Sequence, residues 1–156
     1  MKGGFNMDHS SLRHDQAIAL FRNDRNCAQS VFSVFAKELG IDETEARRIA
    51  AGFGGGMGAL QKTCGAVTGG IMALGAKYFN EQDIPATKNL VYKKVRQLIS
   101  RFESNHGSVE CRPLLGADIS TPEGLKAARD ANLFHLKCEP FVLDVCSIVD
   151  ELFLEP

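Results

Sequence analysis

Apolar residues recur along the chain at intervals of three and four, and no stretch alternates between apolar and polar residues as a half-buried strand would. Near the C-terminus, for example, Val142, Val145, Val149 and Leu152 share one helical face. The pattern predicts helices over residues 10–23, 26–39, 42–51, 64–78, 86–104, 121–132 and 138–156. We therefore expect an all-α fold, a single-domain bundle of about six to seven helices over residues 10–156, behind a flexible tail over residues 1–9.

The helix predicted over residues 64–78 is unusually rich in glycine. Gly65, Gly69 and Ala73 repeat every fourth residue on a face that has almost no side chains. Because glycine costs about 1 kcal/mol per helical position relative to alanine, this face needs a compensating close approach by another backbone or a bulky group. We expect this helix to be central and tightly packed, with Thr63 as its N-cap.

A glycine-rich run, residues 52–58, precedes this helix. It contains a formal match to a dinucleotide-binding fingerprint, but that motif needs a preceding strand, and the preceding segment is predicted to be helical. No Gly-Lys-Ser/Thr sequence follows, so a phosphate loop is excluded as well. We interpret the run as a flexible lead-in that takes unusual backbone angles.

The cysteines are the candidate chemical groups. Cys27, Cys64 and Cys138 precede or occupy the first turns of predicted helices, and Cys111 begins a short turn that contains proline. Helix N-termini offer N–H donors and a positive dipole end, which favour a thiolate. The four cysteines are therefore candidates for redox catalysis or metal binding, with Cys64 as the candidate low-pKa thiolate. Cys146 lies in the apolar stripe of the last helix and is expected to be a core residue.

Composition and net charge restrict which partners and which cellular compartment are expected. The net charge is −1, the isoelectric point is near 6.4, and no cluster of Lys and Arg is present, so nucleic acid is not an expected partner. No apolar run is long enough to insert in a membrane, and no secretion signal is visible, which predicts a cytoplasmic protein. Five cysteines in that compartment point to redox chemistry or metal binding rather than to structural disulfides.

Other polar residues are expected to be solvated. Lys93, Lys94, Arg96 and Arg101 lie mostly away from the apolar stripe of the helix over residues 86–104. His106 and His135 are near two of the cysteines in sequence, but loop histidines are usually solvated. The chain contains no Cys-x-x-Cys pair, which is evidence against zinc ribbons and most ferredoxin-like clusters.

Four segments carry a family resemblance: Asn26-Cys27-Ala28-Gln29, Cys64-Gly65-Ala66-Val67-Thr68-Gly69, Cys111-Arg112-Pro113-Leu114-Leu115-Gly116, and Cys138 with the helix after it. They resemble the redox-active proteins named for the cysteine pattern C_GCAxxG_C_C, and the likeness covers nearly the whole chain after the tail. Thr63 stands before Cys64 where the family name shows glycine, and Cys146 falls outside the pattern. The resemblance implies redox activity without naming a substrate.

The resemblance also implies partners and a cofactor. Family members are often encoded near transporter genes, which implies a redox partner or a transporter-associated protein. Related domains are similar to the non-haem part of split-Soret cytochromes, where an iron-sulfur centre occurs. A cluster bound by the four cysteines is thus a possible cofactor, and the oligomeric state stays open.

We expect a small thiol-based redox or electron-transfer protein that uses Cys27, Cys64, Cys111 and Cys138. These cysteines form either reversible disulfides, for which three pairings are open, or the ligands of an iron-sulfur cluster or a zinc ion. Gly65 and Gly69 are expected to leave room for such a cofactor beside Cys64. The alternative is a non-catalytic structural or transporter-associated interaction protein with buried cysteines.

Overall fold

The computed structural model describes residues 9–156, and within that range all regular secondary structure is helical. The α-helices are α1 (His9–Arg22), α2 (Cys27–Ala36), α3 (Glu43–Ala50), α4 (Gly65–Tyr78), α5 (Ile84–His106), α6 (Cys111–Leu115), α7 (Pro122–Asp130) and α8 (Glu139–Leu154). Short 3₁₀ turns follow α3 and precede α5, and a π-helical turn, Phe134–Cys138, leads into α8. The all-α prediction is confirmed.

Two sequence predictions need adjustment. The described residues form eight α-helices, more than the expected six to seven, because the turn that begins at Cys111 closes into the five-residue α6 before Gly116 ends it in a left-handed conformation. The predicted tail over residues 1–9 lies mostly outside the described residues, and His9 already belongs to α1. No helix in the described range is long and apolar enough to cross a membrane.

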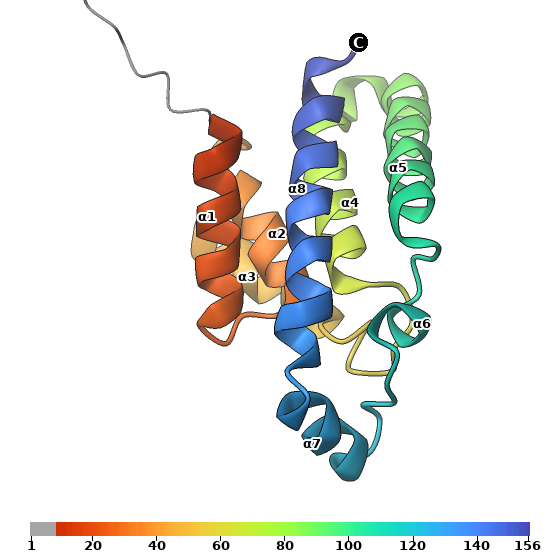
Figure 1. Ribbon diagram of the computed structural model, residues 1–156. Coiled ribbons are helices and arrows are strands. Elements are labelled where there is room, and N and C mark those ends of the chain that lie inside the picture. Colours follow the sequence, from red (N-terminus) through yellow and green to blue (C-terminus); the bar gives the residue numbers. More distant parts are fainter. Residues whose placement is uncertain (1–8) are drawn as a thin grey trace, which may run out of the picture.

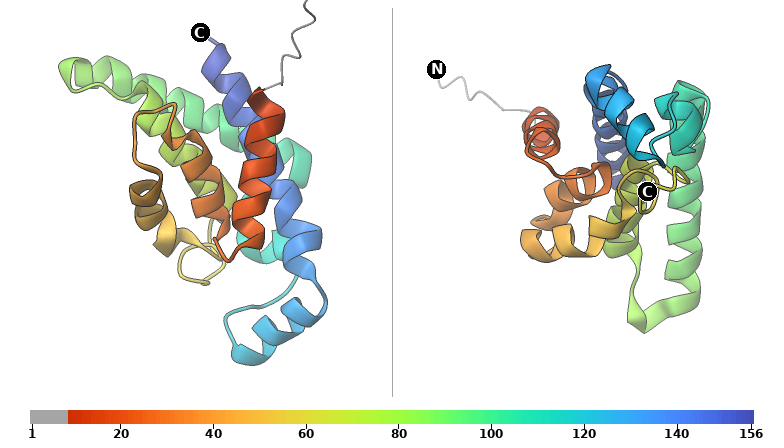
Figure 2. Two further views of the ribbon diagram at one scale, coloured as in Figure 1. Left: turned by 90° about the vertical axis from the view of Figure 1, so that its left-hand side faces the viewer. Right: turned by 90° about the horizontal axis from the view of Figure 1, so that it is seen from below.

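In the view of Figure 1, α1 and α5 run down and α2, α4 and α8 run up; α8 stands between α1 and α5 and in front of α4. Helix α8 contacts α1, α2, α4 and α5. Helices α2, α4 and α8 therefore all begin at the same end of the molecule, the end at which α6 and α7 lie (Figures 1 and 2). This topology gathers several helix N-termini in one place.

Helix α4 is packed closely on two sides, as its glycines predicted. A Cβ atom at Gly69 would lie 2.8 Å from the carbonyl oxygen of Ala28 in α2, and one at Gly70 would lie 2.7 Å from a methyl group of Val145 in α8. The helix begins at Gly65, so its N-cap is Cys64 and not Thr63, one residue later than expected. The close approach of α2 therefore explains the glycine face.

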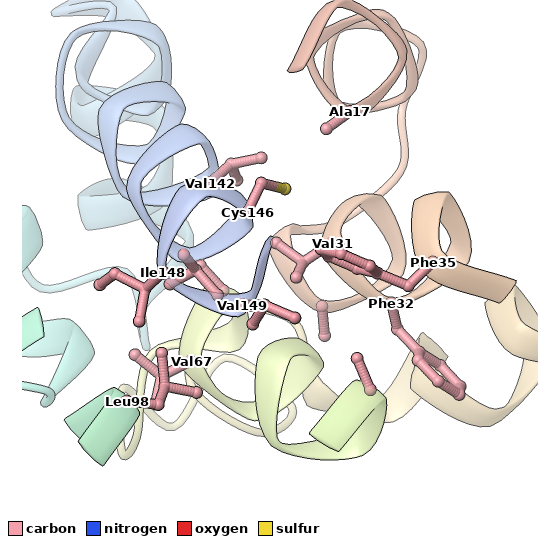
Figure 3. Close-up of a cluster of buried hydrophobic side chains, with 14 of the residues drawn as sticks. Ala17, Val31, Phe32, Phe35, Val67, Leu98, Val142, Cys146, Ile148 and Val149 are labelled. Carbon is pink, nitrogen blue, oxygen red and sulfur yellow. The ribbon is translucent and has the colours of Figure 1, made fainter. Parts of the chain in front are cut away.

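The main core lies between α8 and its neighbours, and Figure 3 shows Val31, Val67, Val142 and Val149 within it. Cys146 is fully buried in this core on the side of α8 that faces α1. Burial raises the pKa of its thiol to about 12. The prediction that Cys146 is a core residue is confirmed.

Lys94 contradicts the expected solvated face of α5. Its side chain is buried, and its Nζ donates hydrogen bonds of 2.9 Å to the carbonyl oxygens of Leu152 and Glu155. The ammonium group also lies 5.1 Å from the centre of the Tyr78 ring. The last carbonyls of a helix have no partner within the helix, and Lys94 supplies one for α8.

Candidate functional site

The four predicted cysteines line a single pocket of about 530 Å³ at the end of the molecule where the helix N-termini gather. Cys27 and Cys111 are the first residues of α2 and α6, and Cys64 and Cys138 directly precede α4 and α8. The prediction that they stand at helix starts is confirmed. Their convergence, which the long gaps between them did not reveal, is a finding of the structure.

Local capping fixes the position of Cys27. The Asn26 side chain accepts a 2.9 Å hydrogen bond from the backbone N–H of Gln29, and the Gln29 side chain accepts one of 3.0 Å from the N–H of Asn26. This reciprocal capping box holds the first turn of α2. Asn26 Nδ2 also donates to the carbonyl oxygen of Ala51, which ties the start of α2 to the segment that leads into the glycine-rich run.

The glycine-rich run is an ordered left-handed coil. Its positive φ angles are at Gly55, Gly56, Met57, Gly58, Ala59 and Gln61. Backbone hydrogen bonds of 2.9 Å join the N–H of Gln61 to Gly55 and the N–H of Lys62 to Gly56. The unusual backbone angles are therefore confirmed, whereas the expected flexible lead-in is replaced by a hydrogen-bonded coil. Non-glycine residues in this conformation cost about 1–2 kcal/mol each, so the coil also holds backbone strain.

This coil shapes the wall of the pocket beside Cys111. A Cβ atom at Gly56 would lie 2.8 Å from the Cβ of Cys111, so no larger residue fits there without moving the cysteine. The segment after the coil pairs with the segment before α6: the N–H of Cys64 donates to the carbonyl oxygen of Val109, and that of Cys111 donates to Lys62, both at 2.7 Å. These two hydrogen bonds fix Cys64 and Cys111 relative to each other.

Gln61 is a site residue that sequence reasoning missed. It is buried; its Nε2 donates to the carbonyl oxygen of Ala117 at 2.7 Å, and its Oε1 accepts from the N–H of Ile119 at 2.9 Å. The side chain also hydrogen-bonds the thiol of Cys111. Nothing in the sequence distinguishes Gln61 from a solvated loop residue, because its partners lie more than fifty positions away.

Cys138 lies at the junction between the π-helical turn and α8. The last helix was predicted to begin at Cys138-Glu139-Pro140, and α8 begins at Glu139 with proline in its first turn. The π-helical turn was not predicted, and it places Phe134 and His135 in the pocket lining. π-helical turns are often found at functional sites.

Cys27 and Cys138 form a hydrogen-bonded pair of thiols. The hydrogen bond from the Cys27 thiol lowers the pKa of Cys138, and the same hydrogen bond, together with burial, raises the pKa of Cys27 well above its ordinary value. The interaction therefore favours the thiolate form at Cys138 and the protonated form at Cys27. A thiolate that is held in this way is the form that attacks disulfides.

Cys64 was expected to have a lowered pKa, and the structure corrects this prediction. Backbone N–H groups of Ala66 and Val67 do donate to its sulfur, as a helix N-terminus should. Burial outweighs these donors and raises the pKa of Cys64 to about 12. Burial also raises the pKa of Cys111, to about 11. Among the cysteines that line the pocket, Cys138 alone has a lowered pKa.

The four cysteines that were expected to be metal or cofactor ligands line the same pocket. All five cysteines are free thiols. Within residues 9–156, no three His, Cys, Asp or Glu side chains are grouped closely enough to hold a metal ion. Gly65 lines the pocket, but Gly69 does not, because α2 fills the space beside it. The cofactor-binding role expected of Gly69 is therefore corrected to helix packing.

The rest of the pocket lining combines aromatic and aliphatic side chains with basic ones. Its large apolar members are Phe21, Leu114, Leu115, Ile119, Leu125, Phe134 and Phe141, and its basic members are Arg22, Arg25, Arg129 and His135. Arg22 donates two hydrogen bonds, of 2.8 and 2.9 Å, to the carboxylate of Glu139. That carboxylate also lies 2.7 Å from Nδ1 of His135. The pocket is thus mostly apolar, with positive charge at its edge.

Comparison with known proteins gives one match. No curated protein and no solved structure matches the chain. A family model described as "Putative redox-active protein (C_GCAxxG_C_C)" matches residues 25–152, a range that runs from just before α2 into the last turn of α8. The match spans all four cysteines of the pocket and agrees with the resemblance seen in the sequence. The chain therefore belongs to the C_GCAxxG_C_C family.

Proposed function

We propose that this protein is a thiol redox protein in which Cys27 and Cys138 interconvert between a dithiol and a disulfide. The observation that carries the proposal is the hydrogen bond between these two thiols inside the pocket. The redox description of the family supports the same class of chemistry. A reducing compartment such as the cytoplasm suits a chain with five free thiols.

We assign the roles of the two sulfurs from the opposite directions of their pKa shifts. Cys138, whose pKa is lowered, is the attacking thiolate, and Cys27 is the resolving thiol that closes the disulfide. Of the three pairings that four cysteines allow, this one leaves Cys64 and Cys111 as the second pair. Because burial raises the pKa of both remaining thiols, we assign them slower oxidation.

Disulfide mapping tests this assignment. The reduced protein is oxidised in steps, trapped with an alkylating reagent and digested without reduction for mass spectrometry. We expect the Cys27–Cys138 disulfide to appear first, and to appear equally in a Cys146→Ala variant, since Cys146 lies outside the pocket. Free thiols at all four positions under every oxidising condition, in a protein without metal, would rule the proposal out.

A second candidate is an iron-sulfur protein. Four thiols around one pocket are a soft donor set, which suits a cluster, and Cys27, Cys64, Cys111 and Cys138 would hold it, with Cys146 not a ligand. When bound, a cluster supplies one-electron transfer. A single zinc ion is the poorer fit, because it needs its sulfurs about 2.3 Å from one point and the described residues do not show that grouping.

Anaerobic purification separates these candidates. Metal analysis and a visible spectrum of the untreated protein would show iron and a coloured band if a cluster is present, and both should be lost in Cys111→Ala but kept in Cys146→Ala. A colourless, metal-free protein would exclude the cluster and leave the dithiol form.

The non-catalytic alternative is a structural or transporter-associated interaction protein, and the burial of Cys64 and Cys138 is the observation that favours it. It requires that each pocket cysteine can be replaced by serine at a modest cost in stability, and that alkylation of the folded protein is slow. Fast alkylation of Cys138 in the folded protein would count against this alternative.

A further inference from the structure

We propose that the pocket takes small anionic disulfides, which the guanidinium groups of Arg25 and Arg129 hold while the Cys27 and Cys138 thiols reduce them. This inference rests on the dithiol form of the proposed function and adds its substrate class. It is carried by the charges in the pocket lining, by the partners that those charges have, and by the size of the pocket.

Two of the three arginines in the lining have no carboxylate partner among the described residues. Arg22 is neutralised by its two hydrogen bonds to Glu139. Arg25 donates only to the carbonyl oxygen of Asn23, at 2.7 Å, and the Arg129 side chain has no hydrogen bond or ion pair with any residue from 9 to 156. Arginines without a partner at a pocket edge are suited to bind carboxylate or phosphate groups.

The pocket lining contains little negative charge that could neutralise these arginines. Asp24 is the only carboxylate among the described residues that line the pocket, and it is exposed. The free guanidinium groups also come from separate parts of the fold: Arg25 precedes α2, and Arg129 is in the last turn of α7. Both arginines line the same pocket.

The size and apolar surface of the pocket fit a small organic molecule. Its volume of about 530 Å³ is within the range of about 300–1,000 Å³ typical of ligand pockets. Phe21, Leu125 and Phe134 offer apolar surface for the carbon skeleton. The four cysteines line the same pocket, so a disulfide held by its charged ends at the arginines would have its sulfurs among the thiols.

The reaction is a pair of thiol–disulfide exchanges. The Cys138 thiolate attacks one sulfur of the bound disulfide; the bond between the two substrate sulfurs breaks, and the first substrate thiolate leaves and takes up a proton. Cys27 then loses its proton and attacks the Cys138 sulfur of the mixed disulfide, which releases the second substrate thiol. Two electrons pass from the two cysteines to the substrate, and one disulfide yields two thiols.

A series of matched disulfides tests the charge preference. Oxidation of the reduced protein is followed with 3,3′-dithiodipropionate, which is a dianion, with neutral 2-hydroxyethyl disulfide, and with cystamine, which is a dication. Each rate is divided by the rate of the same disulfide with dithiothreitol, so that differences in leaving group cancel. We expect the normalised rate to be about tenfold or more higher for the dianion than for the dication at low salt, and this ratio to fall as salt is added.

Variants connect the preference to the two arginines. Arg25→Gln and Arg129→Gln should each lower the normalised rate with the dianion several-fold and leave that of the neutral disulfide unchanged. Arg96→Gln is the matched control, because Arg96 is an exposed arginine of α5 outside the pocket lining. Circular dichroism checks that each variant is folded.

The outcomes separate this inference from the function on which it rests. If all three disulfides oxidise Cys27 and Cys138 at equal normalised rates, or if Arg96→Gln weakens the preference as much as the pocket variants do, anion recognition is wrong and the dithiol function stands. If none of the disulfides oxidises the pair, the inference about small anionic disulfides fails, and the dithiol function fails with it only if Cys27 and Cys138 also stay reduced under every oxidising condition of the disulfide mapping.

Discussion

The hydrogen bond between Cys27 and Cys138 determines which thiol of the pocket ionises first. It lowers the pKa of Cys138, while burial alone would raise that pKa. The same bond, with burial, makes Cys27 the last of the two to lose its proton. At the scale of single residues, a contact between two parts of the chain that are far apart in sequence therefore favours the thiolate form of Cys138.

The first prediction concerns this contact. A Cys27→Ala substitution removes the donor, so the pKa of Cys138 should rise and the midpoint of its pH–alkylation curve should move to higher pH, with slower alkylation at neutral pH. The measurement is the alkylation of Cys138 with iodoacetamide across a pH series, followed by peptide mass spectrometry.

Cys27→Ser is the control, because its hydroxyl group can still donate to Cys138 and should keep most of the lowered pKa. An unchanged midpoint in Cys27→Ala, or a midpoint that moves to lower pH, would contradict the assigned hydrogen bond. Cys64, whose pKa is about 12, should react more slowly than Cys138 in both variants.

At this scale the sequence predicted which cysteines stand at helix starts, but it assigned the lowered pKa to Cys64, whereas the lowered pKa is that of Cys138. Helix N-termini are local features, so the positions of Cys27, Cys64, Cys111 and Cys138 at helix starts were predictable. Cys64 is buried and its N–H pairs with the distant Val109, and no local feature of the sequence indicates either. Gln61 was missed for the same reason.

Two of the helical elements carry features that can be tested by substitution. On α4, Gly69 faces α2 at a distance that a methyl group would violate, whereas Gly75 has no atom within 4 Å of the position of an added Cβ. The two glycines are in one helix and differ only in their surroundings. They form a matched pair.

We predict opposite effects on stability for this pair. Gly69→Ala should lower the free energy of unfolding by about 1–3 kcal/mol, because its Cβ would lie 2.8 Å from the carbonyl oxygen of Ala28. Gly75→Ala should raise it by about 0.5–1 kcal/mol through helix propensity and lower entropy of the unfolded chain. Urea denaturation measures both, and a stabilising Gly69→Ala would refute the close packing of α2 on α4.

Lys94 gives a second element-scale prediction. Lys94→Met keeps the length of the side chain but leaves the carbonyl oxygens of Leu152 and Glu155 without their donor, which should cost about 1–3 kcal/mol of stability. Thermal or urea unfolding measures the loss. The control is Lys93→Met at the exposed neighbouring position, where a change within about 0.5 kcal/mol is expected. Equal effects at both positions would disprove the capping role.

The helices that were predicted correctly have capping residues and an apolar spacing that are visible in their own sequence. Asn26 and Thr121 do cap α2 and α7, and the apolar stripe of α8 is buried as its spacing indicated. The burial of Lys94 was not predictable, because its partners are the carbonyls at the far end of α8. The positive φ angles of the left-handed coil were predictable at its glycines. They were not predictable at Met57 and Ala59, because residues with a side chain disfavour this conformation.

Across the whole molecule, the shared direction of α2, α4 and α8 is what assembles the pocket. Helices α2, α4 and α8 begin at one end, and α6 and α7 close that end, so cysteines from distant segments line one pocket (Figure 1). Helix periodicity predicts the elements, whereas their directions relative to one another depend on packing between distant segments. The sequence could therefore suggest that the four cysteines converge, but only the packed fold establishes it.

The central claim is that Cys27 and Cys138 form one reversible redox couple. The most direct measurement is the fraction of the Cys27–Cys138 disulfide, quantified by mass spectrometry after equilibration in redox buffers of graded potential under anaerobic conditions. We predict a single reversible transition in which the ratio of disulfide to dithiol changes tenfold for about every 30 mV, as a two-electron couple requires. A protein without metal whose Cys27 and Cys138 stay reduced at every potential, or pair with other cysteines instead, would contradict the account.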